Sequence, residues 1–103
     1  MQEKVKQLVE RYELTASPES RYIDLVTQIG ELGKTILEAT DYGYRSFQAS
    51  EEMKHEAGSC LFSLLALLND YGLDETEILE DVLQGYELQM KQYMNETKQK
   101  EKA

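Results

Sequence analysis

Two pairs of oxygen-bearing side chains at helical spacing are the residues of this sequence best suited to chemistry. Glu31 follows Gln28 by three positions, and Ser59 follows Glu56 by the same step. Residues three or four apart share one face of a helix, so each pair would present its oxygens together. Hard cations such as Mg²⁺ bind carboxylate, amide and hydroxyl oxygens. The chemistry expected from these four residues is therefore metal-assisted.

The separation of the two pairs along the chain fits two antiparallel helices. If a hairpin places Glu31 opposite Glu56, its midpoint falls between residues 43 and 44, and the same register places Gln28 opposite Ser59, to within about one turn. The four oxygen donors would carry two negative charges, so Mg²⁺ should bind more weakly there than at four carboxylates. The alternative is that both glutamates are ordinary solvated helix residues, because the chain has 20 acidic residues among 103.

Helix start and stop signals define the elements that must position these residues. Ser17 is a good N-cap and Pro18 suits the first helical position. Ser50 and Asp74 have the same capping character, and Gly72 can adopt the left-handed backbone that ends a helix. Together with the apolar periodicity, these signals predict four helices, over about residues 2–14, 18–39 and 50–70 and from Asp74 onward.

The predicted fold class is all-α, a four-helix bundle of short-looped helices. No segment alternates apolar and polar residues as a half-buried strand would. A single domain over residues 1–103 is expected, with a frayed polar tail over about 97–103. The third helix is apolar around nearly its whole circumference between Cys60 and Leu68. One chain cannot cover such a helix on all sides, which predicts a homodimer or larger assembly.

Composition excludes several classes of function. The net charge is −9 and no basic cluster occurs, which argues against a nucleic-acid partner. No apolar run approaches the roughly 20 residues that span a bilayer, so no membrane association is expected. Cys60 is the single cysteine, so an internal disulfide is impossible. Because the N-terminal segment lacks a signal-peptide apolar core, a cytoplasmic location is expected.

Three glycines fall inside predicted helices, at Gly30, Gly33 and Gly58. Glycine in a helix interior costs about 1 kcal/mol relative to alanine, so a compensating advantage is expected. The sequence leaves two explanations open: close packing of neighbouring helices, and room for a ligand or metal beside the backbone.

The two oxygen-bearing pairs lie in segments that resemble the signature motifs of MazG-type nucleotide pyrophosphohydrolases. Arg21–Lys34 resembles the first motif and Glu52–Leu64 the second, while Leu68–Asp74 fits the close of the third helix in that family. The resemblance extends over about residues 5–95. It implies an all-α fold related to dimeric dUTPases and phosphoribosyl-ATP pyrophosphohydrolases. It also implies cleavage of a nucleoside triphosphate to the monophosphate and pyrophosphate, with Mg²⁺ held by E-E-x-x-E and E-x-x-D acids.

Carried over residue by residue, the resemblance assigns roles to five positions. Glu31 matches the last acid of the first motif, and Glu56 matches the first acid of the second. Thr27 and Gln28 stand where the leading pair of acids is expected, and Ser59 stands at the aspartate. Glu31 and Glu56 are thus the implied catalytic residues, and with Gln28 and Ser59 they form the implied metal site. Three of the five motif acids are replaced, which predicts a weakened Mg²⁺ site.

Other residues near the motifs are candidates for supporting roles. Lys34 and Lys54 can contact phosphate oxygens, and Asn69 can hydrogen-bond a base or a phosphate. Arg45 is a further cation near this region. The alternative for each cation is an ordinary surface role. Three more side chains near the glutamates could replace a lost metal ligand: Asp24, Glu52 and His55.

The sequence therefore predicts a MazG-like nucleoside triphosphate pyrophosphohydrolase with a degenerate magnesium site. Its expected partners are a small-molecule nucleotide and further copies of the chain, as a homodimer or homotetramer. The alternative is a catalytically inactive family member that acts as a nucleotide-binding or oligomeric interaction module. A third hypothesis, a plain structural bundle, predicts that neither nucleotide nor metal binds.

Overall fold

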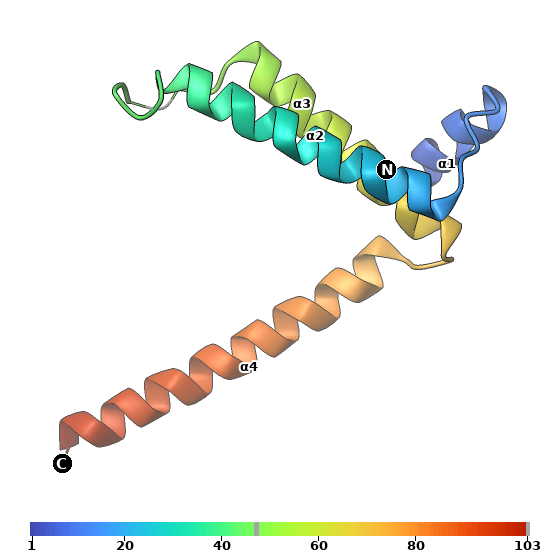
Figure 1. The fold of residues 1–103 in the computed structure, drawn as a ribbon. Helices are drawn as coiled ribbons and strands as arrows, with labels where there is room; N and C mark the ends of the chain where they lie inside the picture. Colours follow the sequence, from blue (N-terminus) through green and yellow to red (C-terminus); the bar gives the residue numbers. More distant parts are fainter. Residues whose placement is uncertain (47, 103) are drawn as a thin grey trace. The chain divides into compact units, whose positions relative to one another are not determined.

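The structure, a computed structural model, describes residues 1–46 and 48–102 and is all-α in this part of the chain. No strand occurs among the described residues, which confirms the predicted fold class. The helices are α1 (Gln2–Arg11), α2 (Pro18–Ala39), α3 (Glu51–Asp70) and α4 (Glu75–Lys102) (Figure 1).

The predicted helix starts are confirmed by hydrogen bonds of the capping side chains. Ser17, Ser50 and Asp74 each accept a hydrogen bond from the backbone N–H three residues later, over 3.2, 3.1 and 3.0 Å. Each bond satisfies one of the backbone donors that a helix leaves free in its first turn. The starts of α2, α3 and α4 are therefore fixed by local chemistry.

Backbone with positive φ marks the places where helices end. Gly72 has φ +64°, as expected for the residue that follows α3. α1 ends at Arg11, earlier than the predicted end near residue 14, because Glu13 has φ +53° and cannot continue a right-handed helix. The loop after α2 has the left-handed residues expected of a strong stop, at Asp41, Tyr42 and Gly43.

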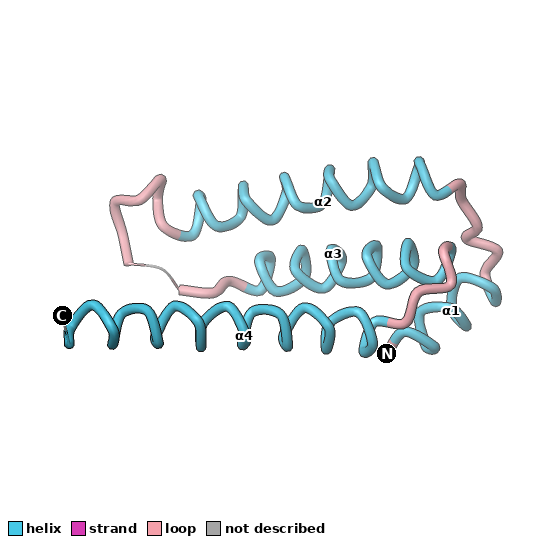
Figure 2. Tube along the Cα trace, turned by 90° about the horizontal axis from the view of Figure 1, so that it is seen from below, coloured by secondary structure: helices cyan, strands magenta, loops and turns pink. Residues whose placement is uncertain are grey.

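The described chain divides into two compact units, Met1–Leu73 and Asp74–Ala103. In the first unit α3 packs against both α2 and α1. α2 and α3 run antiparallel and lie side by side in both views (Figures 1 and 2). The predicted hairpin of the second and third helices is therefore present, and it forms the body of this unit.

The residues of α2 that face α3 form a narrow stripe along the helix, here called the seam. Most buried or half-buried residues of α2 recur at alternating steps of four and three: Arg21, Leu25, Gln28, Leu32, Thr35 and Ala39. This spacing is typical of helices that cross at a shallow angle. The apolar residues of α2 beside this seam are not covered within the first unit, since Tyr22, Val26, Ile29 and Ile36 are all exposed. One neighbouring helix covers a seam, and a wider stripe needs a second neighbour.

α3 is also only partly covered. Of the described residues of the chain, Ala66, Ser63 and Arg21 are buried, with exposures of 2%, 6% and 7%. Leu61 and Leu64 on α3 remain 61% and 40% exposed. The packed interior of this unit is therefore small, and it contains polar as well as apolar side chains.

The helix glycines face open space. A Cβ added at Gly30, Gly33 or Gly58 would meet no atom of another element within 4 Å. Within the first unit, therefore, no close packing of helices occurs at these glycines. Space beside the backbone is present, as the second explanation requires.

The second unit consists of α4. Apolar residues recur along it at steps of four and three, and each is more than half exposed: Leu79, Leu83, Tyr86, Met90 and Tyr93. The segment expected to fray, about residues 97–103, is helical as far as Lys102, and Ala103 lies outside the described residues. None of the described helices combines the length and the apolar character that crossing a membrane requires.

Candidate functional site

An acidic groove lies between α2 and α3 on the first unit. Its volume is about 400 Å³, it is open to solvent, and its lining residues are Glu31, Lys34, Thr35, Glu38, Glu51, Glu52, His55 and Glu56. Both glutamates singled out in the sequence are members of this set. The structure therefore brings Glu31 and Glu56 to one groove from facing helices, as predicted.

The register of the two helices differs from the predicted one by a single turn. Gln28 Oε1 accepts a hydrogen bond from Ser63 Oγ at 2.5 Å. The predicted neighbour of Gln28, Ser59, lies four positions before Ser63 on α3. Four residues correspond to about 6 Å along a helix, so Glu56 lies roughly one turn from the point opposite Glu31. The observed register is therefore shifted by one turn from the predicted one, which is the margin stated for that prediction, and the groove still contains both glutamates.

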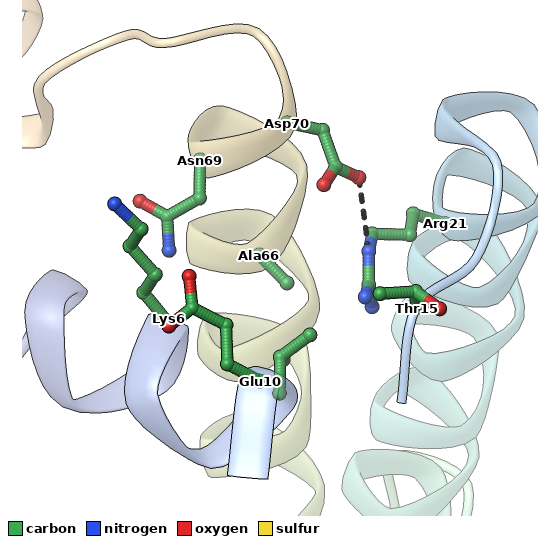
Figure 3. A pocket seen from close by; sticks show the side chains of 8 residues that line it. Lys6, Glu10, Thr15, Arg21, Ala66, Asn69 and Asp70 are labelled. Carbon is green, nitrogen blue, oxygen red and sulfur yellow. Dashed lines mark ion pairs between the residues drawn. The ribbon is translucent and has the colours of Figure 1, made fainter. Parts of the chain in front are cut away.

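A second contact gives the same register. Arg21 Nε lies 2.9 Å from Asp70 Oδ2. Figure 3 marks this ion pair with a dashed line. Arg21 precedes Gln28 by seven residues on α2, and Asp70 follows Ser63 by seven residues on α3. Two side-chain contacts one heptad apart thus agree, as expected for two helices whose contacts repeat every seven residues.

The donors for a magnesium ion are not brought together as a preformed cage. Among residues 1–46 and 48–102, no three His, Cys, Asp or Glu side chains are grouped so that they could hold a metal ion. The Gln28 amide oxygen, one of the predicted donors, is hydrogen-bonded to Ser63. What the groove offers is carboxylates, and Mg²⁺ commonly binds through one or two carboxylates together with substrate phosphates. The groove residues therefore fit Mg²⁺ only when the ion also binds the phosphates of a substrate.

The remaining motif positions lie close to the groove without lining it. Ser59 is half-buried on α3 and is not among the lining residues. The Thr27 hydroxyl donates a hydrogen bond to the Ile23 carbonyl oxygen at 2.9 Å, so it is used within α2. Of the candidate replacement ligands, Glu52 and His55 line the groove, whereas Asp24 does not.

The predicted substrate-binding residues are separated by the structure. Lys34 lines the acidic groove. Lys54 Nζ lies 3.0 Å from Glu51 Oε1 in an exposed ion pair. Asn69 lies 13 positions after Glu56 on α3, about 20 Å along the helix, and its side chain donates a hydrogen bond to the Gln2 carbonyl oxygen at 3.2 Å. Asn69 is therefore not part of the acidic groove.

Asn69 lines a second cavity, about 190 Å³ in volume. Figure 3 shows residues from α1, the following loop, α2 and α3 around it; its lining is Lys6, Val9, Glu10, Thr15, Arg21, Ala66, Asn69 and Asp70. Arg21 Nη2 donates a hydrogen bond to the Leu14 carbonyl oxygen at 2.8 Å. Arg21 thus links the α1–α2 loop to α3.

The sequence reasoning missed Arg21 and Asp70. A signal was present, because a charged side chain at Arg21 falls one heptad before Gln28, on the side of α2 that faces α3. A buried arginine needs an acid and a hydrogen-bond acceptor close by. That requirement predicts a partner such as Asp70, but it does not identify which acid of the chain provides it.

Comparisons with known proteins give no relative for this chain. Searches against protein-family models, curated proteins and solved structures find no match. The resemblance to nucleotide pyrophosphohydrolases therefore rests on the sequence motifs.

Proposed function

We propose that the acidic groove is a weakened nucleoside triphosphate pyrophosphohydrolase site. The observation that carries this proposal is that Glu31 on α2 and Glu56 on α3 line the same groove. The reaction is attack of water on a nucleoside triphosphate, which releases the nucleoside monophosphate and pyrophosphate. A cytoplasmic setting, where such nucleotides are made and used, is part of the proposal.

The charge of the groove determines how a nucleotide can enter it. Five glutamates and one lysine line the groove, so a bare triphosphate is repelled. A triphosphate that arrives with Mg²⁺ has much of its charge neutralised. The ion, when held by Glu31 and Glu56, supplies charge neutralisation of the phosphates and a water of lowered pKa.

The chain's own residues then hold and orient the substrate. Lys34 lies in the groove and provides a cation for phosphate oxygens. Glu31 is exposed and Glu56 is half-buried, so both carboxylates can be reached from solvent. The open groove admits water freely, which fits a slow hydrolase rather than one that encloses its substrate.

A second candidate is a family member that has lost hydrolysis and binds a nucleotide, or assembles with further copies, without turnover. The Gln28–Ser63 hydrogen bond favours it, because it engages an oxygen that the metal site would use. The absence of a three-ligand group among the described residues favours it as well. The two candidates differ in whether pyrophosphate is released.

Pyrophosphate release from a panel of standard and modified nucleoside triphosphates, with Mg²⁺ or Mn²⁺, separates these candidates. Hydrolysis by the groove predicts a slow, metal-dependent release that Glu31→Gln and Glu56→Gln each reduce at least about tenfold. Glu19→Gln on α2 is the matched control, since it removes one charge from the first unit and Glu19 does not line the acidic groove. If all variants release pyrophosphate at the same rate, the hydrolysis does not take place in the acidic groove.

A re-acidified variant, Gln28→Glu/Ser59→Asp, extends the test to a wild-type protein without turnover. If this variant releases pyrophosphate and the wild type does not, the wild-type groove has the fold of the hydrolase but lacks the metal ligands. If neither protein hydrolyses any nucleotide, the catalytic proposal fails. Calorimetric titration of the wild type with Mg²⁺ and a nucleotide then decides whether binding remains.

A further inference from the structure

The cavity lined by Arg21 and Asn69, here called the α1 cavity, has no part in the proposed hydrolysis. Its lining residues lie between Lys6 and Asp70, so the first unit builds it alone. Asn69 is about 20 Å along α3 from Glu56, which separates the α1 cavity from the acidic groove. Its volume of about 190 Å³ equals that of about six water molecules in the liquid, so it admits a small molecule.

Hydrogen bonds hold the walls of the α1 cavity on two sides. Asn69 Nδ2 donates to the Gln2 carbonyl oxygen at 3.2 Å, and Gln2 Nε2 donates to the Leu73 carbonyl oxygen at 2.6 Å. These bonds fasten the start of α1 to the end of α3. On the other side, the bond from Arg21 Nη2 to the Leu14 carbonyl oxygen fastens the α1–α2 loop to α2. The cavity is therefore framed by three helices and a loop that contact one another.

The Arg21 guanidinium offers more hydrogen-bond donors than the described residues use. Its side chain is 9% exposed, and a guanidinium carries five N–H groups. Within the described part of the chain, it donates one hydrogen bond, from Nη2 to Leu14. Nε is buried and makes a charge contact with Asp70 without a hydrogen bond. Since buried polar groups are nearly always hydrogen-bonded, an acceptor inside the cavity is expected. A carboxylate fits best, because its two oxygens match two parallel N–H groups.

The α1 side of the cavity offers an acceptor for a cation. Figure 3 shows Glu10 on one side of Ala66 and Arg21 on the other. Glu10 is exposed, and the ion pairs among the described residues do not include it. Its carboxylate can therefore accept hydrogen bonds from an ammonium group of a ligand. Val9 and Ala66 supply apolar surface between these two charged groups.

We propose that the α1 cavity binds a small zwitterion of the amino-acid type. The carboxylate of the ligand accepts hydrogen bonds from Arg21, and its ammonium group lies against Glu10. A short aliphatic side chain contacts Val9 and Ala66. Two bases and two acids line the cavity, so their charges cancel, which favours a ligand without net charge over an anion or a cation. Binding here does not require nucleotide turnover in the acidic groove.

The test is a titration of the ¹⁵N-labelled full chain with L-valine, followed by the backbone amide signals in NMR spectra. L-Valine at millimolar concentration is expected to shift signals of α1, of the following loop and of the last turns of α3, and the shifts should saturate. Signals of residues around Glu31 in the acidic groove should stay in place. Acetate and methylammonium each carry one of the two charged groups, and each is expected to bind at least about tenfold more weakly.

Substitutions in the cavity assign the binding to named side chains. Glu10→Gln keeps the size of the side chain and removes its charge, so the Kd for L-valine is expected to rise at least about tenfold. Glu3→Gln is the matched control, because Glu3 is on the same helix and does not line the cavity. It should leave the Kd unchanged. Arg21→Lys should also weaken binding, because lysine keeps the charge and loses the planar fork. Circular dichroism checks that each variant stays helical.

Three results would overturn the proposal. The first is an absence of saturable shifts with L-valine up to tens of millimolar. The second is acetate binding as tightly as L-valine, which would make the cavity a site for simple anions. The third is an equal effect of Glu10→Gln and Glu3→Gln on the Kd, which would place the ligand outside the α1 cavity.

Discussion

Arg21 on α2 lies 2.9 Å from Asp70 on α3, measured from Nε to Oδ2, and this ion pair holds the first turn of α2 against the last turn of α3. The Arg21 side chain is 9% exposed and that of Asp70 is 28% exposed. The Nε–H is not aligned well enough to count as a hydrogen bond, so the pair is a charge contact. The Leu14 carbonyl oxygen accepts the hydrogen bond that Nη2 donates.

Replacing one partner of this pair should destabilise the hairpin. Asp70→Asn leaves the buried guanidinium without a counter-charge, and the expected loss in the free energy of unfolding is about 1–3 kcal/mol, below that of a fully buried pair because Asp70 is partly solvated. The control is Asp41→Asn in the exposed Arg45–Asp41 pair, whose charged atoms lie 3.9 Å apart. Its expected change is within about 0.5 kcal/mol. Urea unfolding followed by circular dichroism measures both, and equal effects would contradict the assigned role of the pair.

Alanine at the helix glycines should stabilise the protein. Gly30→Ala and Gly58→Ala each add a Cβ that meets nothing within 4 Å, so a gain of about 0.5–1 kcal/mol is expected from helix propensity. Gly72→Ala should do the opposite, because Gly72 has φ +64°, where alanine is strained. Melting temperatures of the three variants provide the comparison. A loss at Gly30 or Gly58 would mean that a further helix or another molecule packs there.

The contribution of the α3 N-cap to stability can be measured separately from that of the helix. Ser50 Oγ accepts a hydrogen bond from the Met53 backbone N–H at 3.1 Å. Ser50→Ala should cost about 1 kcal/mol, whereas Ser50→Gly should cost only a few tenths. Denaturant unfolding of the two variants measures these two losses in the free energy of unfolding. The reverse order would show that the hydroxyl does not act as a cap.

The register of α2 and α3 can be checked by mutant cycles. Gln28→Ala and Ser63→Ala, alone and together, should show a coupling energy of about 0.5–1.5 kcal/mol, because the two side chains share a hydrogen bond. The corresponding cycle between Gln28 and Ser59 should show a coupling near zero. A larger coupling to Ser59 would restore the register expected from sequence.

Local chemistry explains why much of the fold could be predicted. The starts of α2, α3 and α4 follow from side chains that bond within three residues, and the stop after α3 follows from Gly72. Such interactions need no knowledge of distant parts of the chain. The end of α1 was misplaced because the left-handed backbone at Glu13 has no comparable residue signal.

The candidate site was predictable in part for the same reason. Glu31 and Glu56 reach one groove because the helix periodicity turns both toward the same side of an antiparallel hairpin. Asn69 was grouped with them by its place in a motif, although several turns of α3 separate it from Glu56. Thirteen positions on one helix span about 20 Å, so the sequence spacing itself already separated Asn69 from Glu56.

By itself, then, the sequence determined the helices, their caps and the faces that carry the two glutamates, because these depend on neighbours within a turn. The tertiary structure decided the register. Hairpins that differ by one turn bury almost the same stripe, since seam residues repeat every three or four positions. Contacts between distant side chains, Gln28 with Ser63 and Arg21 with Asp70, distinguish these registers. The structure also decided which apolar residues of α2 are covered within the first unit, because α3 covers only a seam of that helix.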